Sequence, residues 1–257
     1  MPIYLLILFF IVAIAYAAVG FGGGSTYNAL LVLHGTDYRI LPTIALACNI
    51  IVVSGGLWRF WKEGLLAPHA LAPFLIASIP AAWLGGRLPI SETLFIGLLG
   101  MALFLSGIRL LGQRDYVVQS GEKRSIPTIA ALVTGGGIGL LSGLVGIGGG
   151  IFLAPVLYWL AWDTPRKIAA ACSVFILANS ASGLTGQVMK LSDTQLLSLA
   201  LPYWPLLIAV FVGGQIGSWM AATKLDPKIL KRLTAVLILY VAARLLFNWA
   251  GLVGIIS

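Results

Sequence analysis

The stretch "VGFGGGSTYNALL", residues Val19–Leu31, places four glycines within five residues of a run that is otherwise apolar enough to span a bilayer. Glycine carries no side chain and reaches positive φ values at little energetic cost. The stretch therefore predicts a membrane helix that is broken at Gly20–Gly24 and restarts immediately afterwards.

The composition of the whole chain is that of an integral membrane protein. Of its 257 residues, 60% are hydrophobic and 9% are charged, and its mean hydropathy is +1.01; soluble domains are about 25% charged. The apolar stretches are residues 2–19 continuing to 34, 41–58, 65–86, 92–111, 126–145 continuing to 162, 168–189, 194–222 and 229–249. They are continuous rather than alternating, and most reach the roughly 20 residues that a helical span needs. We therefore predict an all-α polytopic membrane protein.

Charged residues are confined to loops and to the ends of the apolar stretches. The 16 Lys and Arg residues outnumber the eight acidic residues, which gives a net charge of +8. Basic residues in these places are typical of topology signals and contacts with lipid head groups rather than of nucleic-acid binding. The eight acidic residues map to the same regions, so the midplane offers no carboxylate relay for a proton pump. The sequence also lacks a P-loop, a metal-ligand cluster and a catalytic carboxylate pair. We expect no enzyme activity, cofactor, bound metal or nucleic-acid partner.

The opening motif occurs a second time. Gly20–Gly24 is matched 126 residues later by Gly146–Gly150, and "IALACN", residues Ile44–Asn49, is matched by "IAAACS", residues Ile168–Ser173. The order of the matches is kept along the chain, which indicates an internal duplication. We divide the chain into a first membrane repeat (1–111), a hydrophilic cytoplasmic linker (112–125) and a second membrane repeat (126–257), each with about four hydrophobic segments, the first of them broken.

The distribution of basic residues favours inverted repeats. If each broken segment returns to the side from which it entered, twelve Lys and Arg residues face one side of the membrane and four face the other. If each broken segment crosses completely, the count is eight against eight. Cytoplasmic loops collect basic residues, so the first arrangement is favoured, with both termini outside.

Paired helix breaks in a membrane protein point to a transport site. Unwound glycines expose several backbone N–H groups, and a restarting helix adds the partial positive charge of its N-terminus, so the pair predicts an anion site at the midplane. The alternative is that the glycines only permit close helix packing and the polar side chains only bond neighbouring helices. The candidate substrate-binding residues are Gly22, Gly23, Gly24, Ser25, Asn28, Cys48, Asn49, Gly148, Gly149, Gly150, Cys172, Ser173, Asn179 and Gln187.

With the motifs "GFGGGSTYNALL" and "GLVGIGGGIFLAPVL" in place, the chain resembles the TauE/SafE family of sulfite-exporter-like membrane permeases. The first motif has Ala29 where the second has Pro155. The resemblance implies a secondary transporter that exports sulfite or an organosulfonate such as sulfoacetate across the bacterial cytoplasmic membrane. The resemblance also implies that the motif glycines 22–24 and 148–150 are functional positions.

Two other functions remain open at this point. An anion channel would use the same helix ends without alternating access. A membrane thiol-based sulfur relay would use Cys48 and Cys172, which occupy the same repeat position, because a thiol accepts sulfane sulfur by exchange.

Overall fold

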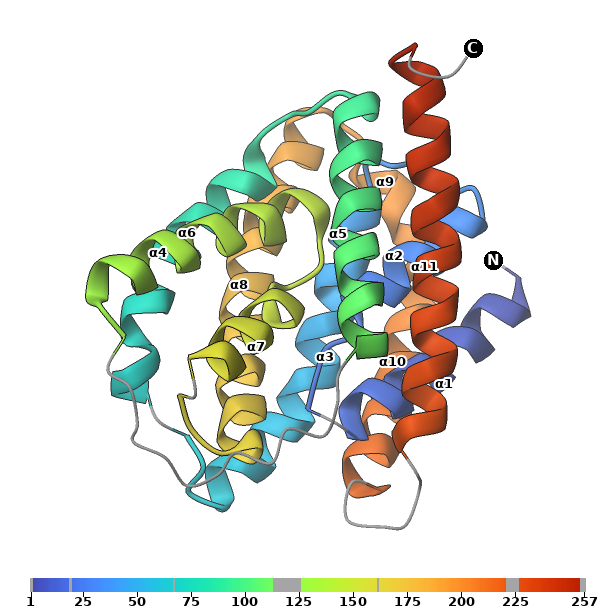
Figure 1. The fold of residues 1–257 in the computed structure, drawn as a ribbon. Coiled ribbons are helices and arrows are strands. Elements are labelled where there is room, and N and C mark those ends of the chain that lie inside the picture. The colour runs from blue at the N-terminus through green and yellow to red at the C-terminus, as the bar shows by residue number, and fades with distance from the viewer. Residues whose placement is uncertain are drawn as a thin grey trace.

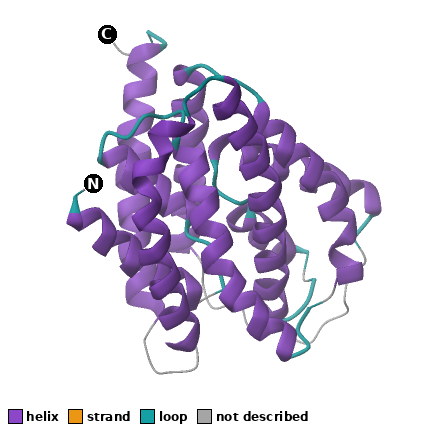
Figure 2. Ribbon diagram, turned by 180° about the vertical axis from the view of Figure 1, so that it is seen from behind, coloured by secondary structure: helices purple, strands orange, loops and turns teal. Residues whose placement is uncertain are grey.

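The chain folds into helices throughout its described residues. A computed structural model of the chain describes residues 2–18, 20–66, 68–112, 126–160, 162–220 and 227–254, and every regular element in these ranges is a helix (Figures 1 and 2). The first half contains α1 (Ile3–Ala18), α2 (Gly24–Leu33), α3 (Leu41–Lys62), α4 (Pro68–Arg87) and α5 (Glu92–Gly112). The second half contains α6 (Thr128–Val145), α7 (Gly150–Trp159), α8 (Pro165–Asp193), α9 (Leu197–Ala200), the 3-10 turn η1 (Leu201–Tyr203), α10 (Trp204–Met220) and α11 (Pro227–Leu252). The linker from residue 113 to 125 lies outside the described residues.

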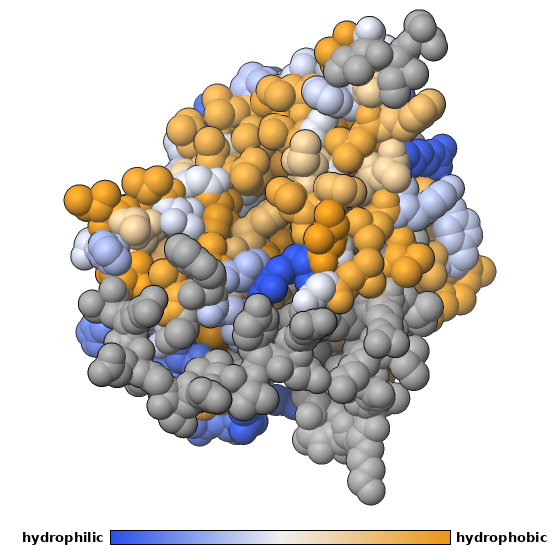
Figure 3. Space-filling view, in the orientation of Figure 1, coloured by the Kyte–Doolittle hydropathy of each residue, from blue (hydrophilic) through white to orange (hydrophobic). Residues whose placement is uncertain are grey.

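The helices have the length and surface of a multi-pass membrane protein. Among the described residues, six helical segments are long and apolar enough to cross a bilayer. Apolar side chains cover most of the described part of the face shown in Figure 3. Ile129 and Val133, one turn apart on α6, are 76% and 71% exposed, as lipid-facing residues are. The all-α polytopic fold predicted from the composition is confirmed.

The two predicted helix breaks are present. α1 ends at Ala18 and α2 starts at Gly24, while α6 ends at Val145 and α7 starts at Gly150. The residue before each new helix has a left-handed backbone, with φ +84° at Gly23 and +79° at Gly149, which favours glycine. A hydrogen bond of 2.7 Å joins Tyr4, at the start of α1, to His34, just after α2. The second helix of the pair therefore folds back toward the start of the first.

Equivalent helices of the two halves pack against each other in opposite directions. Glu63, just after α3, forms a 2.9 Å ion pair with Arg166, near the start of α8. Gly97, near the start of α5, lies against Trp249, near the end of α11. The α3–α8 and α5–α11 pairs are therefore antiparallel, as a pair of inverted repeats requires. The repeat boundaries and the orientation of the halves in the membrane stay predictions.

The helices that end at the breaks pack tightly on the opposite half. α6 lies along α4, and α1 lies along α10 (Figure 1). Glycines permit both contacts, because small residues let helix backbones approach closely in membranes. An added Cβ would meet backbone atoms of α4 at Gly135, Gly139 and Gly143 of α6, and carbonyl groups of α1 at Gly213 and Gly217 of α10. Each break is thus fixed to a helix of the other half.

Replacing Gly139 by alanine is expected to lower the free energy of unfolding by about 1–3 kcal/mol, because the new methyl group overlaps the carbonyl of Ser78. Gly137→Ala is the matched control, since an added Cβ at Gly137 of the same helix meets no atom within 4 Å. Thermal unfolding of both purified variants in detergent measures the difference. Equal melting temperatures for the two variants would contradict this packing.

Candidate anion site at the paired helix breaks

The two helix breaks meet around Asn49, a fully buried residue of α3. A Cβ built on Gly24 would lie 2.5 Å from Asn49 Nδ2, and one built on Gly148 would lie 2.7 Å from the same atom. A Cβ on Gly22 would overlap Asn49 Oδ1. The carboxamide therefore lies between glycines of both halves, and only glycine fits at these three positions while Asn49 keeps its place.

Side chains from each half donate hydrogen bonds to the break of the other half. Asn49 Nδ2 donates to the carbonyl of Ile147 at 3.2 Å, and Ser173 Oγ donates to the carbonyl of Gly20 at 2.5 Å. Asn49 and Ser173 occupy equivalent positions in the two copies. Helix ends leave carbonyl groups without partners, and at membrane depth such groups are satisfied within the protein. The two side chains therefore satisfy one carbonyl group in each break.

A third donor strengthens the contact between the halves. Asn28 of α2 donates from Nδ2 to the carbonyl of Val145, the last residue of α6, at 2.8 Å. The carbonyl groups of Gly146 and Ile147 lie 3.0 and 2.8 Å from a Cβ built on Gly24. The end of α6 is therefore packed directly on the start of α2.

The backbone N–H groups around the starts of α2 and α7 lack such partners. Those that donate to no described residue belong to Gly22, Gly23, Gly24, Ser25, Gly148, Gly149, Gly150 and Ile151. All except Ile151 are buried. Unpaired donors and the positive end of the helix dipole favour an anion at a helix N-terminus. Two such ends in one buried region make an electropositive junction without a charged side chain.

Buried polar atoms of α3 and α8 also lack partners at the junction. Asn49 Oδ1 and Ser180 Oγ have no hydrogen-bond partner, although both residues are fully buried. Ser180 Oγ lies 3.0 Å from a Cβ built on Gly148. Ser180 is not among the predicted residues, although it lies two helical turns after Ser173 on α8 and so faces the same side.

At two other motif glycines an added side chain would meet neighbours other than Asn49. A Cβ on Gly23 would lie 3.2 Å from the ring of Tyr27, and a Cβ on Gly149 would lie 2.8 Å from Ile138 and 2.9 Å from the ring of Phe175. Both glycines have positive φ values, so they turn the chain into the next helix. A side chain added at either glycine would point at these neighbours instead of at Asn49.

Four other predicted residues lie in packed surroundings. Asn179 donates to the carbonyl of Phe175 in its own helix, and Gln187 Nε2 donates to the carbonyl of Gly143 on α6. Cys48 and Cys172 are fully buried in two different hydrophobic clusters. The structure thus brings together glycines 22, 24 and 148 with Asn49, and it flanks them with Asn28 and Ser173.

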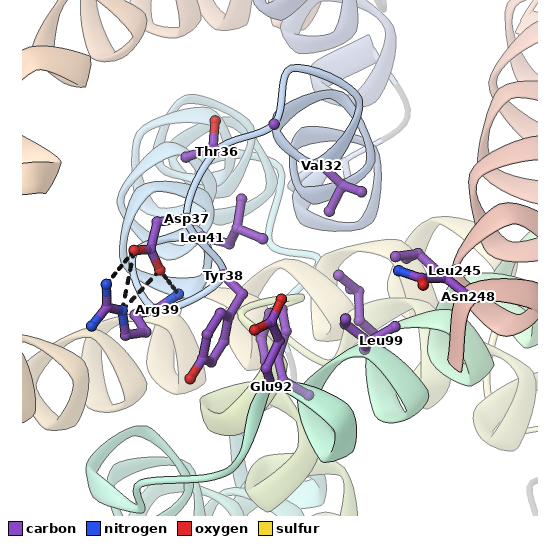
Figure 4. A pocket seen from close by; sticks show the side chains of 13 residues that line it. Val32, Thr36, Asp37, Tyr38, Arg39, Leu41, Glu92, Leu99, Leu245 and Asn248 are labelled. Atoms are coloured by element: carbon purple, nitrogen blue, oxygen red, sulfur yellow. Dashed lines mark hydrogen bonds and ion pairs between the residues drawn. The ribbon is translucent and has the colours of Figure 1, made fainter. Parts of the chain in front are cut away.

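A separate cavity lies at the other end of α2 (Figure 4). It has a volume of about 630 Å³, and its lining includes Asp37, Arg39, Glu92 and Asn248. Arg39 donates to Asp37 from both its backbone N–H, at 2.9 Å, and Nε, at 3.0 Å, and these hydrogen bonds lower the pKa of the Asp37 carboxyl group. Two carboxylates share the lining with a single, already paired cation. The lining is therefore poorly suited to an anion, and it contains none of the predicted site residues.

Two comparisons with known proteins cover nearly the whole chain. The family described as sulfite exporter TauE/SafE matches residues 5–245. A probable membrane transporter protein, y4hK, from Sinorhizobium fredii (strain NBRC 101917 / NGR234) is 36% identical over 245 residues, which cover 95% of this chain and 97% of that protein. No solved structure matches the chain.

Asn49→Ala is expected to lower the free energy of unfolding by about 1–3 kcal/mol, because it leaves the buried carbonyl of Ile147 without a donor. Ser54→Ala is the control, since Ser54 lies on the same helix, is exposed and bonds only to the carbonyl of Ile50 within it. Denaturant or thermal unfolding in detergent compares the two. A loss no larger for Asn49→Ala than for Ser54→Ala would rule out the bridging role.

Proposed function

Because the chain belongs to the TauE/SafE family of membrane transporters, we propose that it exports small sulfur-containing anions across the bacterial cytoplasmic membrane. The substrates are sulfite or an organosulfonate such as sulfoacetate. One observation carries the proposal: glycines of both breaks lie against a single buried carboxamide, that of Asn49, and backbone N–H groups of both breaks donate to no described residue. Paired discontinuous helices of this kind are typical of midplane transport sites.

The chemistry of the junction suits reversible anion binding. Backbone N–H groups, the Asn49 amide and the Ser180 hydroxyl are donors that replace the hydration shell of an oxyanion. The junction offers helix dipoles instead of a Lys or Arg side chain, so the anion is attracted without forming an ion pair. Binding without an ion pair is weak enough to permit release of the anion, which a transporter needs.

The packing supports alternating access. The junction residues are buried, and the two described cavities lie away from them, one beside Asp37 and one on the apolar flank of α1 and α10. The burial of these residues suits the occluded state of a carrier. Because α1 packs closely on α10 and α6 packs closely on α4, each of these helix pairs moves together with the break that follows α1 or α6. Rocking of these pairs against each other exposes the anion to one side at a time.

The energy source is the membrane potential. A membrane that is negative inside favours the exit of an anion by about 2.3 kcal/mol per charge per 100 mV. The antiparallel α3–α8 and α5–α11 pairs support inverted halves, and the bias of basic residues supports termini on the outside. Export then needs no further coupling.

Purified protein in proteoliposomes is expected to carry sulfite at a rate that depends on the sign of the imposed membrane potential. Gly22→Ala is expected to reduce this flux about tenfold or more, because the added Cβ overlaps the Asn49 carboxamide. A loss of about 1.4 kcal/mol in the free energy of anion binding lowers the affinity tenfold. Gly137→Ala is the matched control and keeps the flux. Isotope efflux measured with sulfite, sulfoacetate, thiosulfate, acetate and chloride gives the selectivity.

Several outcomes would contradict the proposal. They are no sulfite flux from folded protein, equal flux of chloride and sulfite, or full activity in Gly22→Ala. A turnover many orders above that of carriers would identify an anion channel instead. Normal flux in a Cys48→Ser, Cys172→Ser double variant would remove the thiol relay, whereas loss of activity in that variant would favour it.

A further inference from the structure

One apolar side chain touches both helix breaks. Ile176 of α8 is 2% exposed, and its Cγ2 atom lies 3.2 Å from a Cβ built on Gly22 and 3.0 Å from one built on Gly148. Its Cδ1 atom occupies the space that a Cβ on Gly150 would need. Ile176 is not among the residues predicted from the sequence, because its side chain has no polar atom.

Ile176 and Asn49 together form two unlike walls of the junction. An added Cβ on Gly22 or on Gly148 would meet both residues, so a carboxamide and a branched hydrocarbon border the same two glycines. In the proposed site, the oxygen atoms of a bound oxyanion accept hydrogen bonds from Asn49 Nδ2 and from the backbone N–H groups of the breaks. Whatever the sulfur atom carries besides oxygen is then left facing Ile176.

We propose that Ile176 is the residue that limits the size of the transported anion, admitting sulfite and the shortest alkylsulfonates and rejecting longer ones. The inference rests on the proposed function of the same junction. A β-branched side chain is stiff at χ1, and close packing on both breaks leaves it little room to rotate away. An anion with a longer carbon chain therefore meets Ile176 directly.

The duplication provides a matched control position. By the alignment of "IALACN" with "IAAACS", Ile176 corresponds to Val52 of α3. Val52 is 1% exposed, but it lies against Gly214 of α10, with Cγ2 3.8 Å from a Cβ built there. Truncating either residue opens a comparable buried space, but only one of the two spaces lies at the junction.

The test compares sulfite, methanesulfonate, ethanesulfonate and butanesulfonate in proteoliposomes containing the full chain. The ratio of butanesulfonate flux to sulfite flux is expected to rise about tenfold in Ile176→Ala, the change that about 1.4 kcal/mol produces. Ile176→Val, which removes only the methyl group next to Gly150, is expected to give a smaller rise. Val52→Ala is expected to leave the ratio unchanged.

An unchanged ratio in both Ile176 variants would overturn the inference, as would an equal rise in Val52→Ala. If Ile176→Ala does not fold, Ile176→Val decides by the same ratio. Where flux is low, competition by butanesulfonate against binding of labelled sulfite replaces the flux ratio. Absence of sulfite flux in the unsubstituted protein would instead refute the proposed function, so the two failures are distinct.

Discussion

The structure depends on one constraint, that backbone polar groups at membrane depth must find partners inside the protein. Breaking two helices there exposes carbonyl and N–H groups that lipid cannot satisfy. Two side chains meet part of the requirement, because Asn49 of the first half and Ser173 of the second each donate to a carbonyl of the opposite break. The other part, the N–H groups, stays unpartnered within the described residues. Unpartnered N–H donors at two helix starts are the feature on which the proposed anion site rests.

The same constraint explains the distribution of glycine outside the motifs. Each break can act as a binding surface only if the helix leading to it is held in place. Glycines on α6 and α10 allow the backbones of α4 and α1 to approach closely enough for that. The contacts cross between the halves, so neither repeat encloses the junction alone. The α1–α10 and α4–α6 pairs each join one helix of the first half to one helix of the second.

Much of this arrangement was predictable from the sequence, because its signals are local and duplicated. The composition predicts membrane helices, and the paired glycine runs predict the breaks and bring Asn49 into consideration. Other features depended on packing between distant segments. Ile176 and Ser180 reach the junction only because α8 lies against both breaks, and Gly23 and Gly149 face away from it although they belong to the motif. The role of Gly139 depends on α4, which a single sequence does not place beside α6.

The most direct test is to locate a bound anion. Selenite has the shape and charge of sulfite and scatters X-rays anomalously, so its position in crystals of the protein is measurable. We expect an anomalous peak between Gly22 and Gly148, within hydrogen-bond distance of Asn49, and loss of that peak in Gly22→Ala. A peak in the cavity lined by Asp37 and Glu92, with none at the junction, would contradict it.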